Sequence, residues 1–417
     1  MKHSVLTCLV AWVVLTSARL CSLAPLGEGR DDTDHVLDAI STCGINGVIE
    51  LKPGSFNITR KMTWTLHNTI ISLRGKLTFP PNVTYWLDPA NTYRIVRIQS
   101  QASWFVVTGS NFVIDGHGVG GIDGQGQTWW EYYQSHAKAD GDGRPISLTL
   151  HEAKNAVVRN FRIESPPFWC NTVAQSSDVV YDGMYCNATN ANPIYTGKNI
   201  VPNTDGICTY RSDTVILRNW DITCGDDCLA IKGNSTNIYA HGVTCRGGNG
   251  IAVGSLGQYI GEEDNVHNVL LEDLKLLRLP EDVQPNMQKG IYFKSWTGTA
   301  NGEPPTAGGG GLGTVTNITA RRVFVDRVRN PVQLYQTNNG KSTDAPSQLS
   351  FSNLTFEDWS GTAVTTSIVD MRCSSAASCP GITFKMFNVT GPEGQAPTCR
   401  FDNVIGSTGL DSTSCTA

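Results

Sequence analysis

The stretches DTVILRNWDITC (213–224) and TNIYAHGVTC (236–245) share one pattern, a short β-rich run broken by Asn, Gly or Asp. Val215 and Ile238 occupy equivalent positions in the two runs and are 23 residues apart. A recurring period in the twenties with strand-like units indicates a solenoid, in which each repeat stacks on the next. The two stretches are therefore predicted to be successive coils of one stack.

The same pattern recurs along most of the chain. In NAVVRNFRI (155–163) and DVVYDGMYC (178–186), Val157 and Val179 are 22 residues apart, and larger gaps elsewhere leave room for inserted loops. Leucine-rich repeats share this period, but their Leu-rich consensus and helical segments are missing. The 42 glycines and the scarcity of amphipathic helical patterns favour a parallel β-helix. We predict an all-β fold with a single domain over residues 19–417.

The N-terminal residues 1–18, MKHSVLTCLVAWVVLTSA, have the features of a cleaved signal peptide: a basic start, an apolar run and small residues at the end. The apolar run is too short to span a bilayer. The formal net charge is −5 with both signs interspersed, which does not indicate a nucleic-acid surface. We expect a secreted, extracellular monomer with neither a membrane nor a nucleic-acid partner.

Cysteines and glycosylation sequons agree with secretion. The chain has 13 cysteines, and removal of Cys8 with the signal peptide leaves an even number, which supports disulfides without fixing their connectivity. The spacings suggest the local pairs Cys21–Cys43, Cys170–Cys186, Cys208–Cys224, Cys228–Cys245, Cys373–Cys379 and Cys399–Cys415. No His joins these cysteines at zinc spacing, so no metal site is expected. Glycosylation is predicted at the sequons of Asn57, Asn82, Asn187, Asn234, Asn317, Asn353 and Asn388.

Several polar residues recur at one-coil spacing. Asp205 precedes Asp226 by 21 residues, and Asn249 follows Asp227 by 22. Lys294 comes one or two coils later. Because coils stack at about 4.8 Å, residues one period apart become neighbours in space. We therefore expect these five side chains to gather on one lateral face of the solenoid.

Three clustered carboxylates cannot all ionise freely, so at least one of their pKa values should rise. A protonated acid beside ionised bases is what hydrolysis of a glycosidic bond requires. Asp and Asn also cap turns, and either the NTDG or the GDDC motif alone would be weak support for catalysis. Their joint occurrence at one-coil spacing favours an active site.

The motifs NTDG (203–206), GDDC (225–228), GNGIAVGS (248–255) and IYFKSW (291–296), in this order and spacing, resemble glycoside hydrolase family 28. That family contains pectin-cleaving polygalacturonases, rhamnogalacturonases and their exo-acting relatives. The resemblance implies a right-handed parallel β-helix, a pectic polysaccharide or oligosaccharide as substrate, inversion of anomeric configuration and no cofactor.

Carried over by motif, the resemblance implies that Asp226 is the general acid and that Asp205 and Asp227 hold and activate the attacking water. The expected substrate-binding residues are Asn203, Asn249, Tyr292, Lys294 and Lys232. Two positions depart from the family pattern, because Asn249 replaces a His and Tyr292 replaces the Arg of an R-I-K motif. His241 falls in a strand and is not expected to replace the missing His.

The segment 187–203 enlarges the coil before the aspartates, and in exo-acting relatives such insertions close one end of the cleft. Tyr292 offers a neutral hydroxyl and an apolar ring, so it should bind an uncharged sugar, while Lys294 pairs with a carboxylate. This combination predicts release of terminal α-L-rhamnose from rhamnogalacturonan-type chains. The alternative is an exopolygalacturonase that releases terminal galacturonate, with Lys232 or Lys289 replacing the Arg.

Two further classes of function compete with hydrolysis. A non-catalytic pectin-binding β-helix would explain the missing His. A pectate lyase shares the solenoid but uses an Arg or Lys base and bound Ca²⁺. The three retained aspartates favour the hydrolase over both.

Overall fold

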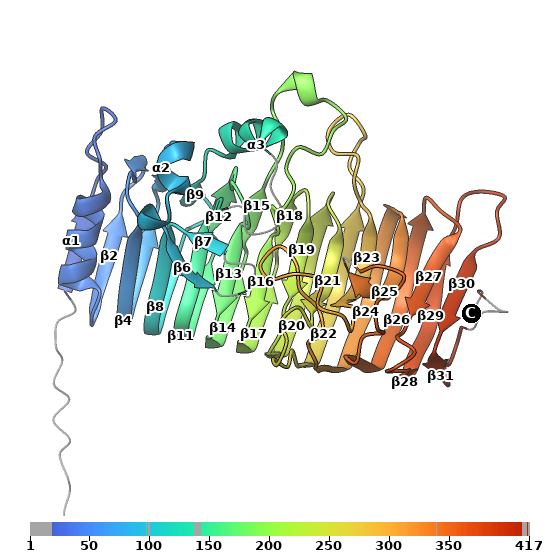
Figure 1. Cartoon of the computed structure of the whole chain (residues 1–417). Helices are drawn as coiled ribbons and strands as arrows, with labels where there is room; N and C mark the ends of the chain where they lie inside the picture. The colour runs from blue at the N-terminus through green and yellow to red at the C-terminus, as the bar shows by residue number, and fades with distance from the viewer. Residues whose placement is uncertain are drawn as a thin grey trace, which may run out of the picture.

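The computed structural model describes residues 19–96, 98, 101–136, 143–338, 340–410 and 415. In this part of the chain 26 strands form one continuous sheet whose neighbouring strands are parallel. The strands follow one another from end to end of the molecule in chain order, as the parallel β-helix prediction requires (Figure 1). The expected signal peptide lies outside the described residues. No helix in the described part is long and apolar enough to cross a membrane.

Three stacks of parallel strands form the walls of the solenoid. The first contains β13 (Asn171–Ala174), β16 (Ile207–Tyr210), β19 (Asp227–Ile231), β21 (Gly250–Leu256), β23 (Lys289–Trp296), β25 (Asn330–Asn338), β27 (Ser367–Arg372) and β30 (Thr398–Asp402). The second contains β1 (Arg19–Leu23), β2 (Gly47–Leu51), β4 (Met62–Leu73), β8 (Phe105–Asp115), β11 (Leu148–Arg159), β14 (Ser177–Asp182), β17 (Asp213–Arg218), β20 (Ser235–Arg246), β22 (Val266–Leu277), β24 (Thr314–Val328), β26 (Ser350–Ala363) and β29 (Ile382–Thr390). The third contains β3 (Ser55–Asn57), β5 (Lys76–Thr78), β9 (Gly121–Asp123), β12 (Arg162–Glu164), β15 (Tyr185–Asn187) and β18 (Asp221–Thr223).

The strand register agrees with the sequence period at one place and corrects it at another. The 23-residue step from Val215 to Ile238 is confirmed, since these residues are partners in β17 and β20. The expected alignment of Val157 with Val179 is wrong by one residue, because Val157 pairs with Val180. Val179 is buried in the core, whereas Val157 is only half-buried. Since side chains alternate between the two faces of a strand, only this register keeps the core side chains inside.

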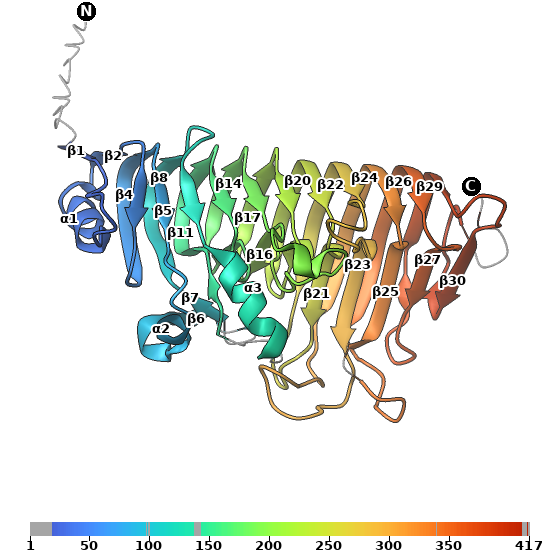
Figure 2. The same cartoon turned by 90° about the horizontal axis from the view of Figure 1, so that it is seen from above.

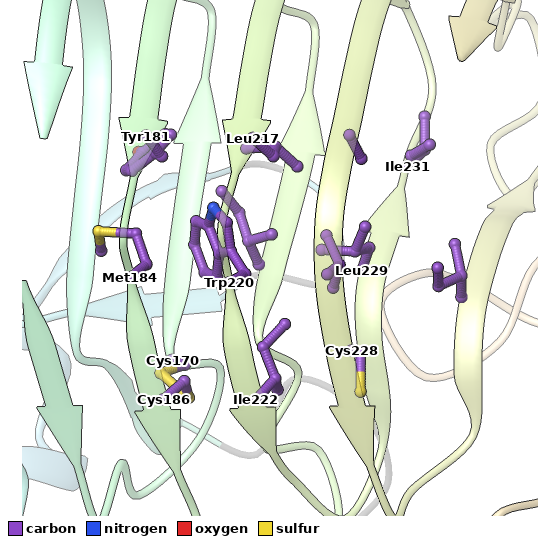
Figure 3. Packing of buried hydrophobic residues seen from close by; sticks show 14 of the residues in the cluster. Cys170, Tyr181, Met184, Cys186, Leu217, Trp220, Ile222, Cys228, Leu229 and Ile231 are labelled. Atoms are coloured by element: carbon purple, nitrogen blue, oxygen red, sulfur yellow. A yellow bond between two sulfur atoms is a disulfide. The ribbon is translucent and has the colours of Figure 1, made fainter. Parts of the chain in front are cut away.

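The interior is filled by apolar side chains that stack from coil to coil (Figure 3). Tyr181 and Leu217 are register partners on adjacent coils, and both are fully buried. Trp220 lies in the same core and is 2% exposed. Each such large side chain stabilises the fold by roughly 1.5–3 kcal/mol relative to an exposed one.

Asparagines at the turns form a ladder along the outside of the solenoid. Asn68 donates from Nδ2 to the side-chain oxygen of Asn46 at 3.0 Å, Asn111 donates to Asn68 at 3.1 Å, and Asn155 donates to Asn111 at 2.7 Å. All four have positive φ, between 50° and 56°. Asn tolerates this left-handed conformation better than most residues, which explains why Asn recurs in the repeat.

Several elements lie outside the stacks (Figures 1 and 2). These are the helices α1 (Thr33–Cys43), α2 (Val83–Leu87) and α3 (Gly126–Ser135), the 3₁₀ turns η1 (Pro89–Asn91) and η3 (Pro193–Tyr195), the small sheet of β6 (Tyr93–Val96), β7 (Gln101–Ser103) and β10 (Pro145–Ile146), and the strand pair β28 (Cys379–Pro380) and β31 (Val404–Ile405). α1 contacts β1, β2 and β4 at the N-terminal end and buries Val36 and Ile40 there. α3 and η3 project from the same side of the solenoid (Figure 1).

Candidate active site

A polar pocket of about 220 Å³ lies on the outside of the first stack. Its lining residues are Gln101, Phe168, Trp169, Asn203, Asp205, Asp226, Asp227, Lys232, Asn249, Ser255, Lys294 and Asn338. Seven of the eight catalytic and substrate-binding residues expected from the sequence are among them, and the exception is Tyr292. The structure therefore brings the aspartates, the two asparagines and the two lysines together, as the one-coil spacing predicts.

Beside the pocket, a row of register partners runs along the outside of the first stack, and three of its four side chains are small. Cys208, Ala230, Ala252 and Tyr292 are successive register partners in β16, β19, β21 and β23. All four belong to an apolar cluster separate from the solenoid core. Because the first three side chains are small, there is room above them for the longer side chains that carry the polar groups.

Asp226 receives hydrogen bonds on both carboxylate oxygens. Asn203 donates to Oδ2 from its backbone N–H at 3.1 Å and from Nδ2 at 3.3 Å, and Asn249 Nδ2 donates to Oδ1 at 2.8 Å. Burial raises the pKa of Asp226 to about 6, the charge of Asp227 adds to the rise, and Lys294 and the donors oppose it. A carboxyl group with this pKa can hold a proton in mildly acidic solution and give it up in a reaction.

Backbone geometry at two positions holds these donors in place. Gly248 has a φ of +68°, and a Cβ at this residue would lie 2.0 Å from the backbone oxygen of Asp226. Only glycine permits this approach, which lets the N–H of Asn249 bond the same oxygen at 2.8 Å. Asn203 also has a left-handed backbone, at φ +58°. Both amides are thus positioned by turns between coils.

Asp227, the first residue of β19, is 2% exposed and has two donors. The Tyr292 hydroxyl donates to Oδ1, and Lys294 Nζ lies 3.5 Å from Oδ2 and 3.1 Å from the Tyr292 oxygen. Although burial opposes it, the charge of Asp227 raises the pKa of Lys294, so the ammonium is retained beside the carboxylate. Tyr292 and Lys294 thus fix the position of the Asp227 carboxyl group in the pocket wall.

Tyr292 lies outside the lining of the pocket, so the expectation that it binds the sugar stays a prediction without support from its position. The side chain is 3% exposed, its hydroxyl is bonded to Asp227, and its ring stacks on Tyr335 with 6.5 Å between centroids. A tyrosine behind the carboxylate can tune that carboxylate but does not form the pocket wall. Its register partner in the preceding coil is the small Ala252, which belongs to the same apolar cluster.

Asp205 is stacked one coil before Asp227, because the N–H of Gly206 bonds the Asp227 carbonyl at 2.9 Å. Burial raises the pKa of Asp205 well above its ordinary value, and the charges of Asp226 and Asp227 add to the rise. Nearby lysines oppose it. The three carboxylates therefore share fewer than three negative charges, as their clustering predicts.

Lys232 is the second cation of the pocket. It is 4% exposed, and its ammonium lies 4.8 Å from the centroid of the Trp169 ring. Among the described residues no carboxylate oxygen lies within 4.0 Å of this ammonium, in contrast to Lys294. The charge of Lys232 opposes the rise in the pKa of Asp205, so the ammonium acts on the carboxylate cluster without a direct ion pair. The aromatic face of Trp169 compensates part of the cost of burying the charge.

Five of the six expected disulfides are present, and one is wrong. The bonded pairs are Cys21–Cys43, Cys170–Cys186, Cys228–Cys245, Cys373–Cys379 and Cys399–Cys415. Cys208 and Cys224 are free, because they lie on opposite faces of the wall. The Cys208 thiol is on the pocket side and donates to Asp205 Oδ2 at 3.4 Å, whereas Cys224 is in the core, 3.5 Å from the Cys228 sulfur.

Other residues considered from the sequence lie outside the pocket. His241 is in β20 and its Nδ1 lies 2.9 Å from Asp273, so it does not replace the missing family His. All seven sequon asparagines are at least partly exposed, so glycosylation there stays a prediction.

Sequence reasoning missed five of the lining residues, Gln101, Phe168, Trp169, Ser255 and Asn338. The N–H of Cys170 bonds the Asp205 carbonyl at 2.7 Å, so Phe168 and Trp169 belong to the coil before Asp205. A 35-residue gap that includes the 187–203 insertion hid this relation. Gln101 and Asn338 come from distant segments without any motif.

A carboxyl group with a raised pKa beside two further carboxyl groups on the outer wall is the arrangement that acid–base hydrolysis of a glycosidic bond uses. Residues 59–415 match the family "Glycosyl hydrolases family 28", and the chain belongs to this family of glycoside hydrolases. It is 37% identical over 419 residues to "Putative galacturan 1,4-alpha-galacturonidase A" of Aspergillus flavus, covering 94% of each chain.

Two further proteins are similar to this chain, one in sequence and one in structure. The chain is 32% identical to "Alpha-L-rhamnosidase rgxB" of Aspergillus niger, covering 94% of this chain and 90% of that one. The crystal structure of endo-xylogalacturonan hydrolase from Aspergillus tubingensis has a TM-score of 0.75 at 22% identity, over 94% of this chain and all of the other. This structure supports the fold, and the resemblance seen in the sequence motifs is confirmed at the level of the family.

Proposed function

We propose that this glycoside hydrolase acts on pectin from the chain end and releases a terminal galacturonate. The observation that carries the proposal is the buried Lys232 ammonium, which lines the pocket and, among the described residues, has no carboxylate oxygen within 4.0 Å, although its charge acts on Asp205. A galacturonate carboxylate would supply a direct ion-pair partner. The 37% identical relative named as a galacturan 1,4-alpha-galacturonidase supports the same reading.

The size and surroundings of the pocket support action at the chain end. A volume of about 220 Å³ is below the range of roughly 300–1,000 Å³ typical of larger ligand sites, which suits one sugar ring rather than several. Hydrogen bonds attach the segment 187–203 to two other parts of the chain. Asn190 accepts from Gln127 of α3 at 2.9 Å, and Gly197 donates to the Asp282 carbonyl at 3.1 Å.

The mechanism follows from the environments of the three carboxyl groups. Asp226, whose pKa is raised to about 6, gives its proton to the glycosidic oxygen as the bond to the anomeric carbon breaks. A water held by Asp205 and Asp227 attacks that carbon from the opposite face and loses its proton to one of them, which inverts the configuration. Tyr292 and Lys294 hold the Asp227 carboxyl group in position for this step.

Release of terminal rhamnose is the second candidate function. The 32% identical relative named as an α-L-rhamnosidase favours it. Tyr292 does not favour rhamnose over galacturonate, because its hydroxyl is bonded to Asp227.

The test compares kcat/KM on galacturonate-terminated and rhamnose-terminated oligosaccharides for wild type and Lys232→Met. We expect wild type to prefer the galacturonate terminus. Loss of a charge-assisted hydrogen bond should cost the variant roughly 10- to 100-fold on that substrate and little on the other. Lys289→Met is the matched control, since Lys289 is half-buried, bonds Asn330 at 3.4 Å and lies outside the pocket.

Two outcomes would contradict the proposal. A wild-type preference for the rhamnose terminus would favour the second candidate. An equal loss on both substrates in Lys232→Met would show that the lysine acts on the aspartates and not on a substrate carboxylate.

A further inference from the structure

Gln101 is a buried amide without a partner at the edge of the active site. It is the first residue of β7 and is 0% exposed. Neither its side-chain oxygen nor its nitrogen has a hydrogen-bond partner within the described part of the chain. The same side chain lines the pocket that contains the three aspartates. A buried amide without a hydrogen-bond partner destabilises the folded protein, so its presence here requires an explanation.

The small sheet β6–β7–β10 places Gln101 in this position. β7 pairs with β10 in parallel and with β6 in antiparallel orientation, Val96 being the register partner of Gln101. Val96 and Ile146 of this sheet belong to the same apolar cluster as Trp169. The sheet is thus fixed against the pocket wall by apolar packing, which holds the amide at the pocket without a hydrogen bond from the described residues.

We propose that Gln101 binds hydroxyl groups of the terminal sugar and thereby contributes to the choice of substrate. An amide offers two donors and one acceptor, and neighbouring sugar hydroxyls can each donate and accept, so the two groups can form paired hydrogen bonds. The amide cannot titrate, which excludes a role as acid or base. The inference rests on the proposed function, because it takes the pocket as the site of the terminal sugar.

The first experiment separates a substrate-binding role from a structural one by two measurements on Gln101→Met. A Met has a similar length and no hydrogen-bonding groups to leave unpaired. We expect kcat/KM to fall roughly 10- to 100-fold because the sugar loses its partners, while the melting temperature stays the same or rises. A structural glutamine would give the opposite result, a lower melting temperature with unchanged kcat/KM.

Gln395→Met serves as the matched control, because Gln395 is exposed in a loop outside the active site. It should change neither quantity. Gln101→Glu, which keeps the shape and the acceptor oxygen but replaces the NH₂ donor with a second oxygen, is the second variant. If Met and Glu variants both fail to fold, the amide is structural and the proposal is overturned.

The second experiment identifies the hydroxyl. Oligosaccharides lacking one hydroxyl of the terminal sugar are compared with the intact substrate in wild type and in Gln101→Met. Removing the hydroxyl that Gln101 binds should lower kcat/KM in wild type. In Gln101→Met the same change should alter kcat/KM by no more than about two-fold, because the hydroxyl has already lost its partner. Equal losses in both proteins for every deoxy substrate would overturn the inference.

Failure of the proposed function gives a different result. If wild type prefers the rhamnose terminus, the comparison is repeated with deoxy-rhamnose substrates, and Gln101 is judged by the same coupling. If wild type cleaves neither substrate, the proposed function alone fails, and the coupling is measured from calorimetric binding of the same oligosaccharides.

Discussion

Replacing Asp226 with Asn should stabilise the protein at neutral pH while removing its activity. Burial and the charge of Asp227 raise the pKa of Asp226 from 3.8 to about 6. A shift of about two pKa units corresponds to about 3 kcal/mol of unfavourable free energy for the ionised carboxylate in the folded state. Between pH ~4 and ~6 the folded state binds more protons than the unfolded state, so the free energy of unfolding falls as pH rises through this window.

The gain in the free energy of unfolding from Asp226→Asn should be smaller than about 3 kcal/mol for two reasons. Asp226 is partly exposed at the pocket wall, and Asn offers one acceptor oxygen where Asn203 and Asn249 now donate to two. One of the two amides must rotate to present its oxygen. We expect Asp226→Asn to be more stable than wild type by about 1–3 kcal/mol at pH 7 and nearly equal to it at pH 4.

The assay is denaturant unfolding at both pH values, combined with turnover of a pectic oligosaccharide. Turnover should fall by roughly 10²- to 10⁴-fold, since an amide cannot protonate the leaving oxygen. Asp213→Asn is the control, because Asp213 is exposed and a hydrogen bond from Thr236 lowers its pKa, so no gain is expected. A stability difference independent of pH would refute the raised pKa, and wild-type turnover would refute the assignment of the acid.

Tyr292→Phe should lower kcat several-fold with less effect on KM, because it removes a donor to Asp227 and not a substrate contact; a change confined to KM would contradict this. A thiol titration should detect Cys208 and Cys224 only after denaturation, and reaction of either in the native protein would contradict their burial. If the segment 187–203 closes one end of the cleft, digestion should release monosaccharide while the viscosity of the polymer falls slowly, whereas a rapid fall with a ladder of oligomers would show internal cleavage.

The period in the sequence was sufficient to predict the fold and most of the site. A solenoid converts a regular spacing into proximity, so Asp205, Asp227 and Asn249 could be placed on one face before any coordinates were known. The spacing alone cannot fix the strand register to within one residue. Val157, expected to align with Val179, pairs with Val180. A one-residue ambiguity is harmless for a motif four residues long, but it decides which face a side chain occupies.

Side-chain direction and inserted segments account for what the sequence could not predict. Cys208 and Cys224 have a spacing suitable for a disulfide, yet Cys208 in β16 belongs to the outer apolar cluster and Cys224, in the turn after β18, belongs to the core. Tyr292 was assigned to the sugar because it replaces an Arg, but its hydroxyl donates to Asp227, a contact that the motif does not reveal. Gln101 enters the pocket through an inserted sheet outside the repeat, so no spacing could reveal it.

The helix α1 has a consequence for how the molecule behaves in a crowded solution. A stack of parallel coils has no built-in length, and its terminal strands offer backbone N–H and C=O groups to any other strand that fits. α1 contacts β1, β2 and β4, and the disulfide between Cys21 and Cys43 ties its last residue to β1. A helix cannot extend a β-sheet. At this end the chain therefore carries its own barrier to head-to-tail growth into filaments.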